Sequence, residues 1–377
     1  MTLRVLISGG GSGGHIYPCL SVARHLNAGA SSNGDSASSR AADLLYIGGP
    51  RPIDRRLVEE AGIPFEAIPV GGLRGMGVRA IANAARLPGG LVQALQLMRR
   101  FDPNVALISG GYVSAPIVAA ATVLRVPLVV LTLEIDHGWV NLAAARVAAA
   151  VTASYPPAVA QLPPERTVLT GYPVRDEFLH LDRARARATL ELDADLPVLA
   201  VFGGSQGSHH INEALAGTLP DLLLATQVLH ICGEADLPGL EERRSQVPAT
   251  LRGRYRLFDY LPAEEMANVL SVADLAVCRA GASTLAELPL AGLPAIMVPG
   301  PFSSQPVNAE YLREEGAVTV IADADLTPDA LREGALALLR DRPRLEEMAG
   351  KMLALARPDA AEAIAAIVRR VAAVGRL

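Results

Sequence analysis

His15 is a titratable side chain placed where it can do chemistry, directly after the run VLISGGGSGG. Gly9, Gly11 and Gly14 in this run satisfy the pattern G-x-G-x-x-G. The apolar residues before the glycines predict a buried parallel strand, and the apolar spacing after His15 predicts a helix. Because glycine allows a close backbone approach and a helix N-terminus offers free N–H groups, this unit favours an anionic ligand. Tight packing of a helix on a strand, without a ligand, is the alternative.

The same glycine pattern occurs in dinucleotide-binding proteins, in which an acidic residue closes the second strand about 20 residues further on. In this chain the second predicted strand, ADLLYIGG, ends in glycines instead. The sequence therefore argues against NAD, and we expect no cofactor.

Length and composition indicate a two-domain protein of the cytoplasm. The chain has 377 residues, of which 50% are hydrophobic and 19% charged, enough for two cores. Its net charge of −5 gives no reason to expect a nucleic-acid partner. Cys19, Cys232 and Cys278 lie far apart in apolar segments, which predicts reduced core thiols. We expect no membrane span and no signal peptide, because no apolar run is long enough and the first residues lead directly into a strand.

The strand, glycine loop and helix recur along the chain. PNVALISGGYVSAP repeats the theme at Gly110 and Gly111, and PVLAVFGGSQGSHHIN opens the second half with another glycine loop. Such alternation builds parallel sheets with ligands at the carboxyl ends of the strands. We predict an α/β protein with two Rossmann-like domains whose parallel sheets face an interdomain cleft. The first spans residues 1–175, with a helix at 357–377 packing back on it, and the second spans residues 176–356.

Two further segments carry weaker signals. The Ser-rich stretch 27–42 predicts a surface insertion without a function. The segment Leu73–Leu87 mixes Arg74, Arg79 and Arg86 with apolar residues, which fits either an anionic membrane surface or a solvated amphipathic helix.

Two Asp-x-Asp pairs have a spacing that can hold a metal ion. They are Asp193 with Asp195, and Asp323 with Asp325. Both pairs fall in predicted turns, so we expect solvated turn residues and no obligatory metal.

Five motifs together resemble a known family: GGGSGGHIYP, GGYVSAP, GYPVR, FGGSQGSHHIN and CRAGASTLAELPLAGLP. Their order and spacing from about residue 3 to 320 resemble glycosyltransferase family 28, which has the GT-B fold. The resemblance implies inverting transfer of N-acetylglucosamine from UDP-GlcNAc to an undecaprenyl-diphosphate-linked muramoyl-pentapeptide. This step belongs to peptidoglycan synthesis for the cell wall, and thus to cell shape and division, at the inner face of the plasma membrane. The first domain would then bind the acceptor and the membrane, and the second the UDP-sugar donor.

The resemblance also implies site residues. It makes His15 the catalytic base, or the residue that orients the acceptor hydroxyl, and the helix N-terminus is expected to keep its ring neutral. The implied donor-binding residues are Arg175, Ser205, Gln206, Gly207, Leu261, Arg279, Thr284, Glu287, Gln305 and Asn308. The implied acceptor-binding residues are Gly11, Ser12, Gly13, Gly14, Gly111, Tyr112, Asp136 and Asn141.

Each donor residue has an implied task. The loop containing Ser205 and Gln206 would hold the UDP diphosphate and stabilise its departing charge. Glu287 would accept hydrogen bonds from the ribose hydroxyls, and the backbone at Leu261 would read the uracil edge. Gln305 and Asn308 would contact the donor sugar, while Arg175 and Arg279 would lie near the diphosphate and the nucleotide.

The chain departs from the family where the acceptor is expected to bind. The family's His-Glu-Gln-Asn run reads Leu133, Glu134, Ile135, Asp136 here, and PGPFSS precedes Gln305. Aspartate in place of asparagine adds negative charge near an acceptor diphosphate. Three alternatives therefore stay open: a related UDP-sugar transferase with another lipid or glycan acceptor, a non-catalytic paralogue that binds nucleotide sugar, and a UDP-sugar epimerase.

Overall fold

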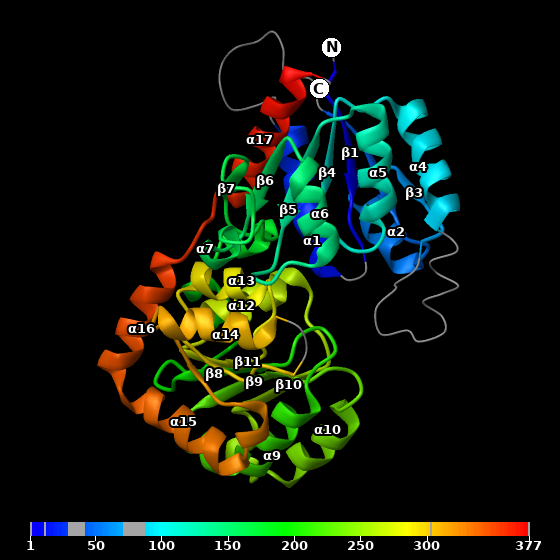
Figure 1. Ribbon diagram of the computed structural model, residues 1–377. Helices are drawn as coiled ribbons and strands as arrows, with labels where there is room; N and C mark the ends of the chain where they lie inside the picture. Colours follow the sequence, from blue (N-terminus) through cyan, green and yellow to red (C-terminus); the bar gives the residue numbers. More distant parts are fainter. Residues whose placement is uncertain (1, 11–12, 29–41, 71–86, 302–303, 376–377) are drawn as a thin grey trace. The chain divides into compact units, whose positions relative to one another are not determined.

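The computed structural model describes residues 2–10, 13–28, 42–70, 87–301 and 304–375 (Figure 1). Gly11, Ser12, most of the 27–42 insertion and all of Leu73–Leu87 except its last residue lie outside these ranges. The chain divides into two units, Met1–Arg175 with Pro358–Leu377, and Asp176–Arg357.

The first unit is built on a seven-stranded parallel sheet in the order β3-β2-β1-β4-β5-β6-β7. Its elements are β1 (Arg4–Ser8), α1 (Gly13–Ala28), β2 (Asp43–Gly48), α2 (Pro52–Glu60), β3 (Phe65–Ala67), α4 (Leu87–Phe101), β4 (Val105–Ile108), α5 (Ser114–Leu124), β5 (Leu128–Thr132), α6 (Trp139–Val147), β6 (Ala150–Ala153), α7 (Pro156–Val159), β7 (Thr167–Leu169) and α17 (Ala360–Val374). Val5, Leu6 and Ile7 of β1 are fully buried, as expected for a parallel strand covered on both faces.

The second unit has a six-stranded parallel sheet in the order β10-β9-β8-β11-β12-β13. Its elements are η1 (Asp176–Leu179), α8 (Arg183–Thr189), β8 (Val198–Phe202), α9 (His209–Leu223), β9 (Gln227–Ile231), α10 (Leu237–Gln246), α11 (Ala249–Arg252), β10 (Tyr255–Phe258), α12 (Ala263–Val272), β11 (Leu275–Cys278), α13 (Thr284–Ala291), β12 (Ala295–Met297), α14 (Gln305–Glu314), β13 (Val318–Val320), η2 (Asp323–Asp325), α15 (Pro328–Arg340) and α16 (Arg342–Ala354). The predicted fold class of two parallel-sheet α/β domains is confirmed.

In each sheet the strand order reverses at one place, between β1 and β4 in the first unit and between β8 and β11 in the second. In open α/β sheets, ligands bind outside the carboxyl ends of the strands at this reversal, because loops diverge there and leave space. The glycine loops after β1, β4 and β8 all begin at these carboxyl ends. The topology therefore places the sequence-predicted loops where this fold binds ligands.

Helix α1 carries His15 in its first turn and is held there by the GYPVR motif. Pro18 has no N–H, so the carbonyl of Gly14 lacks its helical partner. The hydroxyl of Tyr172 donates to that carbonyl at 3.2 Å. The guanidinium of Arg175 lies over the ring of Tyr17, 5.0 Å from its centroid. Both contacts fix the end of α1 that bears the histidine.

The other end of α1 is held by α17, which returns to the first unit and lies against α1 (Figure 1). Arg369 of α17 donates hydrogen bonds to the carbonyl oxygens of His25 and Leu26, at 2.9 and 3.0 Å. The last carbonyls of a helix have no partner within it, so this guanidinium satisfies groups that α1 leaves open.

All three cysteines are buried and free, as predicted. Among the described residues, we find no helix with the length and apolarity needed to cross a membrane.

We expect Arg369→Ala to lower the free energy of unfolding by about 1–2 kcal/mol, because two charge-assisted hydrogen bonds to helix carbonyls are lost. Arg370→Ala, on the exposed side of the same helix, is the matched control and is expected to change stability by less than about 0.5 kcal/mol. Urea denaturation measures both variants. Equal effects of the two substitutions would contradict the capping role of Arg369.

Candidate active site

His15 is fixed by reciprocal hydrogen bonds with Ser109, the residue that follows β4. Its Nδ1 lies 2.9 Å from the carbonyl oxygen of Ser109, and the Ser109 hydroxyl donates to the His15 carbonyl at 3.0 Å. A carbonyl only accepts, so Nδ1 must carry the hydrogen. The neutral ring therefore keeps an unprotonated Nε2, which can accept a proton from a ligand.

Glycines allow this contact between the loops after β1 and β4. A Cβ on Gly9 would lie 2.0 Å from the Ser109 hydroxyl, and a Cβ on Gly111 would lie 2.2 Å from the Gly10 carbonyl. Gly111 also has φ of +80°, which side chains rarely tolerate. The glycines thus bring two loops of the protein together as well as leaving room for a ligand.

Burial lowers the pKa of His15 below its ordinary value of 6.5, and the hydrogen bond to Ser109 opposes this only in part. Water no longer solvates the imidazolium well, so the neutral form is favoured. The sequence also predicts a neutral His15 ring, but attributes it to the helix N-terminus. The largest cause of the lowered pKa is burial.

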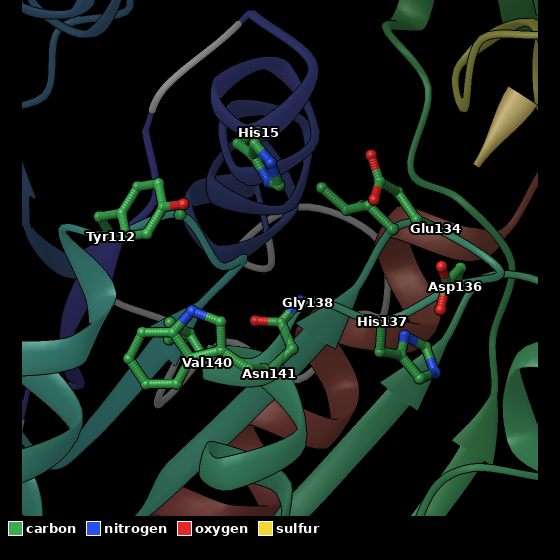
Figure 2. Close-up of a pocket in the computed structure, with 11 residues that line it drawn as sticks. His15, Tyr112, Glu134, Asp136, His137, Gly138, Val140 and Asn141 are labelled. Atoms are coloured by element: carbon green, nitrogen blue, oxygen red, sulfur yellow. The ribbon is translucent and has the colours of Figure 1, made fainter. Parts of the chain in front are cut away.

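His15 lines a pocket of about 170 Å³ at the carboxyl ends of β4 and β5 (Figure 2). The other lining residues are Gly111, Tyr112, Leu133, Glu134, Asp136, His137, Gly138, Trp139, Val140 and Asn141. Four predicted acceptor-binding residues, Gly111, Tyr112, Asp136 and Asn141, are therefore brought together with the predicted base. Gly13 and Gly14 lie in the first turn of α1, outside the set that lines the pocket.

Two buried acceptor atoms of this pocket have no hydrogen-bond partner among the described residues: Oδ1 of Asn141 and Nδ1 of His137. Nε2 of His137 lies 2.9 Å from the carbonyl oxygen of Ala158 and must donate to it, which leaves Nδ1 as an acceptor. A buried acceptor of this kind can be satisfied by water or by a ligand that donates a hydrogen bond.

Sequence reasoning did not single out Glu134, His137 and Trp139 as pocket residues. Burial raises the pKa of the Glu134 carboxyl, nearby Asp136 raises it further, and His137 opposes the shift. Trp139 is the first residue of α6, with 56% of its surface exposed. The signal for Glu134 was present in the sequence, since it lies between the two departures Leu133 and Asp136.

The second glycine loop presents Ser205 and Gln206 at its exposed tip, just before α9 begins. Gly207 has φ of +76°, and a Cβ there would lie 1.8 Å from the Cys232 carbonyl. That carbonyl accepts a hydrogen bond from Nδ2 of Asn212 at 2.8 Å. The loop is thereby held against β9 with its tip free, as a helix N-terminus that binds an anion requires.

Arg279, at the end of β11, ties this loop to the neighbouring strand ends. Its Nε donates to the Ser208 hydroxyl at 3.1 Å, and its Nη1 donates to the Val298 carbonyl at 3.0 Å and to Asp323 at 2.5 Å. Asp323 lies in the turn η2 and is partly exposed, but it is also paired with Arg279, which the sequence did not predict. Asp323 also lies 3.4 Å from Nδ1 of His210.

Three other predicted donor-binding residues lie in the second unit, and one lies in the first. Thr284 and Glu287 lie in the first turn of α13, and Leu261 is buried in the loop between β10 and α12. Arg175 belongs to the first unit, where it lies on Tyr17.

Gln305 and Asn308 bond to backbone within their own unit. Oε1 of Gln305 accepts from the Gly300 N–H at 2.8 Å. Asn308 is fully buried, and its Nδ2 donates to the Ala280 carbonyl at 3.0 Å. Oδ1 of Asn308 has no hydrogen-bond partner among the described residues, so the predicted sugar contact stays a prediction.

Across the described ranges, no group of three or more His, Cys, Asp and Glu side chains is placed to hold a metal ion.

Comparison with known proteins identifies both halves of the chain. The Glycosyltransferase family 28 N-terminal domain matches residues 5–152, and the Glycosyltransferase family 28 C-terminal domain matches residues 198–364. A relative from Roseiflexus sp. (strain RS-1) is 37% identical over 96% of this chain and 94% of its own length. A relative from Desulforudis audaxviator is 35% identical over 99% of this chain and 100% of its own length. Both are named UDP-N-acetylglucosamine--N-acetylmuramyl-(pentapeptide) pyrophosphoryl-undecaprenol N-acetylglucosamine transferase.

The crystal structure of Acinetobacter baumannii MurG matches with a TM-score of 0.76. It is 26% identical, and the match covers 98% of this chain and 99% of that one.

The lowered pKa of His15 predicts the pH dependence of catalysis. If the neutral ring takes the proton, the acid limb of kcat/KM for sugar transfer is expected to be centred below pH 6.5. Protonation of Nε2 below the pKa removes the acceptor lone pair, so the decline has a slope of one. A pH profile with saturating donor measures it; an acid limb centred above pH 6.5 would contradict the neutral, buried base.

Proposed function

The chain belongs to glycosyltransferase family 28 and is a glycosyltransferase; from this premise we propose how its residues carry out the reaction. Its function is transfer of N-acetylglucosamine from UDP-GlcNAc to the lipid-linked muramoyl-pentapeptide acceptor of peptidoglycan synthesis. Its relatives are named for the same reaction. The observation that carries the mechanism is the neutral His15 in a pocket with two unpartnered acceptor atoms.

In the proposed mechanism the acceptor sugar occupies the His15 pocket. Nε2 of His15 takes the proton of the attacking hydroxyl as its oxygen bonds to the anomeric carbon of the donor. The bond from that carbon to the diphosphate breaks in the same step, which inverts the anomeric centre. The UDP diphosphate then rests on the loop of Ser205 and Gln206, whose N–H groups and helix N-terminus stabilise the developing negative charge.

Around this step, Glu287 and the backbone at Leu261 bind the ribose and the uracil. Arg279 fixes the glycine loop through Ser208 and contributes positive potential beside it. We propose no metal, because the loop N–H groups and helix α9 supply the charge stabilisation.

Asp136 lines the His15 pocket, so this departure from the family lies where we propose that the acceptor binds. The names of the relatives, which match over nearly their full length, support the muramoyl acceptor over a different lipid or glycan acceptor.

Transfer of labelled N-acetylglucosamine from UDP-GlcNAc to a short-chain muramoyl-pentapeptide diphosphate lipid tests the function. His15→Gln is expected to lower kcat by about 10²–10⁴-fold, the range for loss of a general base. The matched control His25→Gln, on the same helix α1, is expected to keep wild-type activity. Glu287→Gln is expected to raise the KM for the donor and leave that for the acceptor unchanged.

Robust UDP-GlcNAc binding without transfer by the wild type would support a non-catalytic paralogue. Release of an epimerised sugar would support the epimerase alternative.

We also propose that the protein acts as a peripheral protein at the inner face of the plasma membrane. The support is the lipid-linked acceptor together with the basic and apolar sequence of Leu73–Leu87, most of which lies outside the described residues. Binding to phosphatidylglycerol vesicles is expected to weaken as salt rises from about 0.05 to 0.5 M. Replacing Arg74, Arg79 and Arg86 together with Ser should abolish most of this binding, and vesicle co-sedimentation measures it. Unchanged sedimentation of the triple variant would refute this assignment.

A further inference from the structure

Trp139 is the single tryptophan of the chain. It follows Gly138 as the first residue of α6, and 56% of its surface is exposed. An indole that stays half in water gives up much of the stabilisation that its burial would provide. It nevertheless lines the pocket that contains His15.

The residues around Trp139 supply the groups that a sugar requires. Tyr112 adds a second aromatic ring from the loop after β4, and Figure 2 shows its side chain facing the same space as those of His15 and Asn141. Oδ1 of Asn141 is buried without a partner and accepts hydrogen bonds, as does Nε2 of His15. A pyranose has apolar C–H faces and a rim of hydroxyl donors, which match aromatic faces and acceptor atoms respectively.

We propose that Trp139 is the platform on which the pyranose ring of the acceptor rests, so that its hydroxyl faces Nε2 of His15. The inference rests on the proposed transferase function and assigns an acceptor-specificity residue to it. The pocket volume of about 170 Å³ is below the roughly 300–1,000 Å³ of pockets that enclose a drug-sized ligand. It therefore takes one ring of the acceptor and leaves the diphosphate, lipid and peptide outside.

An exposed tryptophan also occurs in proteins that touch a bilayer, at the level of the lipid head groups. Here the neighbouring charges disfavour that role. Glu134 and Asp136 line the same pocket, and carboxylates are repelled by an anionic membrane surface. The charge pattern thus favours a sugar over a lipid.

Because Trp139 is the single tryptophan, its fluorescence reports on this pocket directly. The probe is the short-chain muramoyl-pentapeptide diphosphate lipid, added without donor to the full-length protein. We expect saturable quenching or a blue shift with this acceptor, and no change with UDP-GlcNAc alone or with phosphatidylglycerol vesicles free of acceptor. A change with empty vesicles and none with the acceptor would overturn the proposal in favour of a membrane contact.

Steady-state kinetics then separates a sugar platform from a structural role. Trp139→Ala is expected to raise the KM for the acceptor about 10-fold, as loss of an aromatic stacking contact does, with the KM for UDP-GlcNAc changed less than about twofold. Trp139→Phe keeps an aromatic face and is expected to restore most of the affinity. Val147→Ala, which truncates an exposed apolar residue on the same helix, is the matched control and should leave both KM values unchanged.

An unchanged acceptor KM in Trp139→Ala would overturn the platform while leaving the transferase function intact. Absence of transfer by the wild-type protein would instead count against the proposed function, and the fluorescence titration would still decide whether the acceptor sugar binds at Trp139.

Discussion

The reciprocal hydrogen bonds between His15 and Ser109 join the loops that leave β1 and β4 where the strand order of the first sheet reverses. This contact sets the position of the imidazole, places its hydrogen on Nδ1 and leaves Nε2 as an acceptor. It is possible only because Gly9 has no Cβ, which would overlap the Ser109 hydroxyl. The contacts of Tyr172 and Arg369 with the two ends of α1 hold the helix that carries the histidine.

In the second unit, a charged side chain holds the glycine loop that follows β8. This loop also begins at a reversal of strand order, but it is held by the guanidinium of Arg279 and by Asn212, not by a histidine. Arg279 is balanced by Asp323 within the same unit. In the proposed mechanism the first unit supplies a neutral base, and the second supplies an exposed helix N-terminus that binds the diphosphate. These are the two functions that an inverting transfer from a nucleotide sugar needs.

The repeated strand, glycine loop and helix pattern predicted the parallel sheets, because strands that are buried on both faces consist of continuous apolar residues. It also identified His15, which lies next to that pattern in the sequence. Its partner Ser109 lies 94 residues away along the chain, and no local periodicity reports such a contact. The burial of Asn308 and the pairing of Asp323 with Arg279 likewise depend on tertiary packing, which the motifs do not report. Trp139 was visible as a lone tryptophan, but its place beside His15 required the fold.

The central claim is that His15 is a neutral base with its hydrogen on Nδ1, and ¹⁵N NMR of histidine-labelled protein measures this directly. The His15 signals are assigned by their loss in His15→Gln. At pH 7 we expect a protonated Nδ1 and an unprotonated Nε2, with a coupled hydrogen on Nδ1 only. A hydrogen on Nε2 of the neutral ring, or a doubly protonated imidazolium at this pH, would contradict the account.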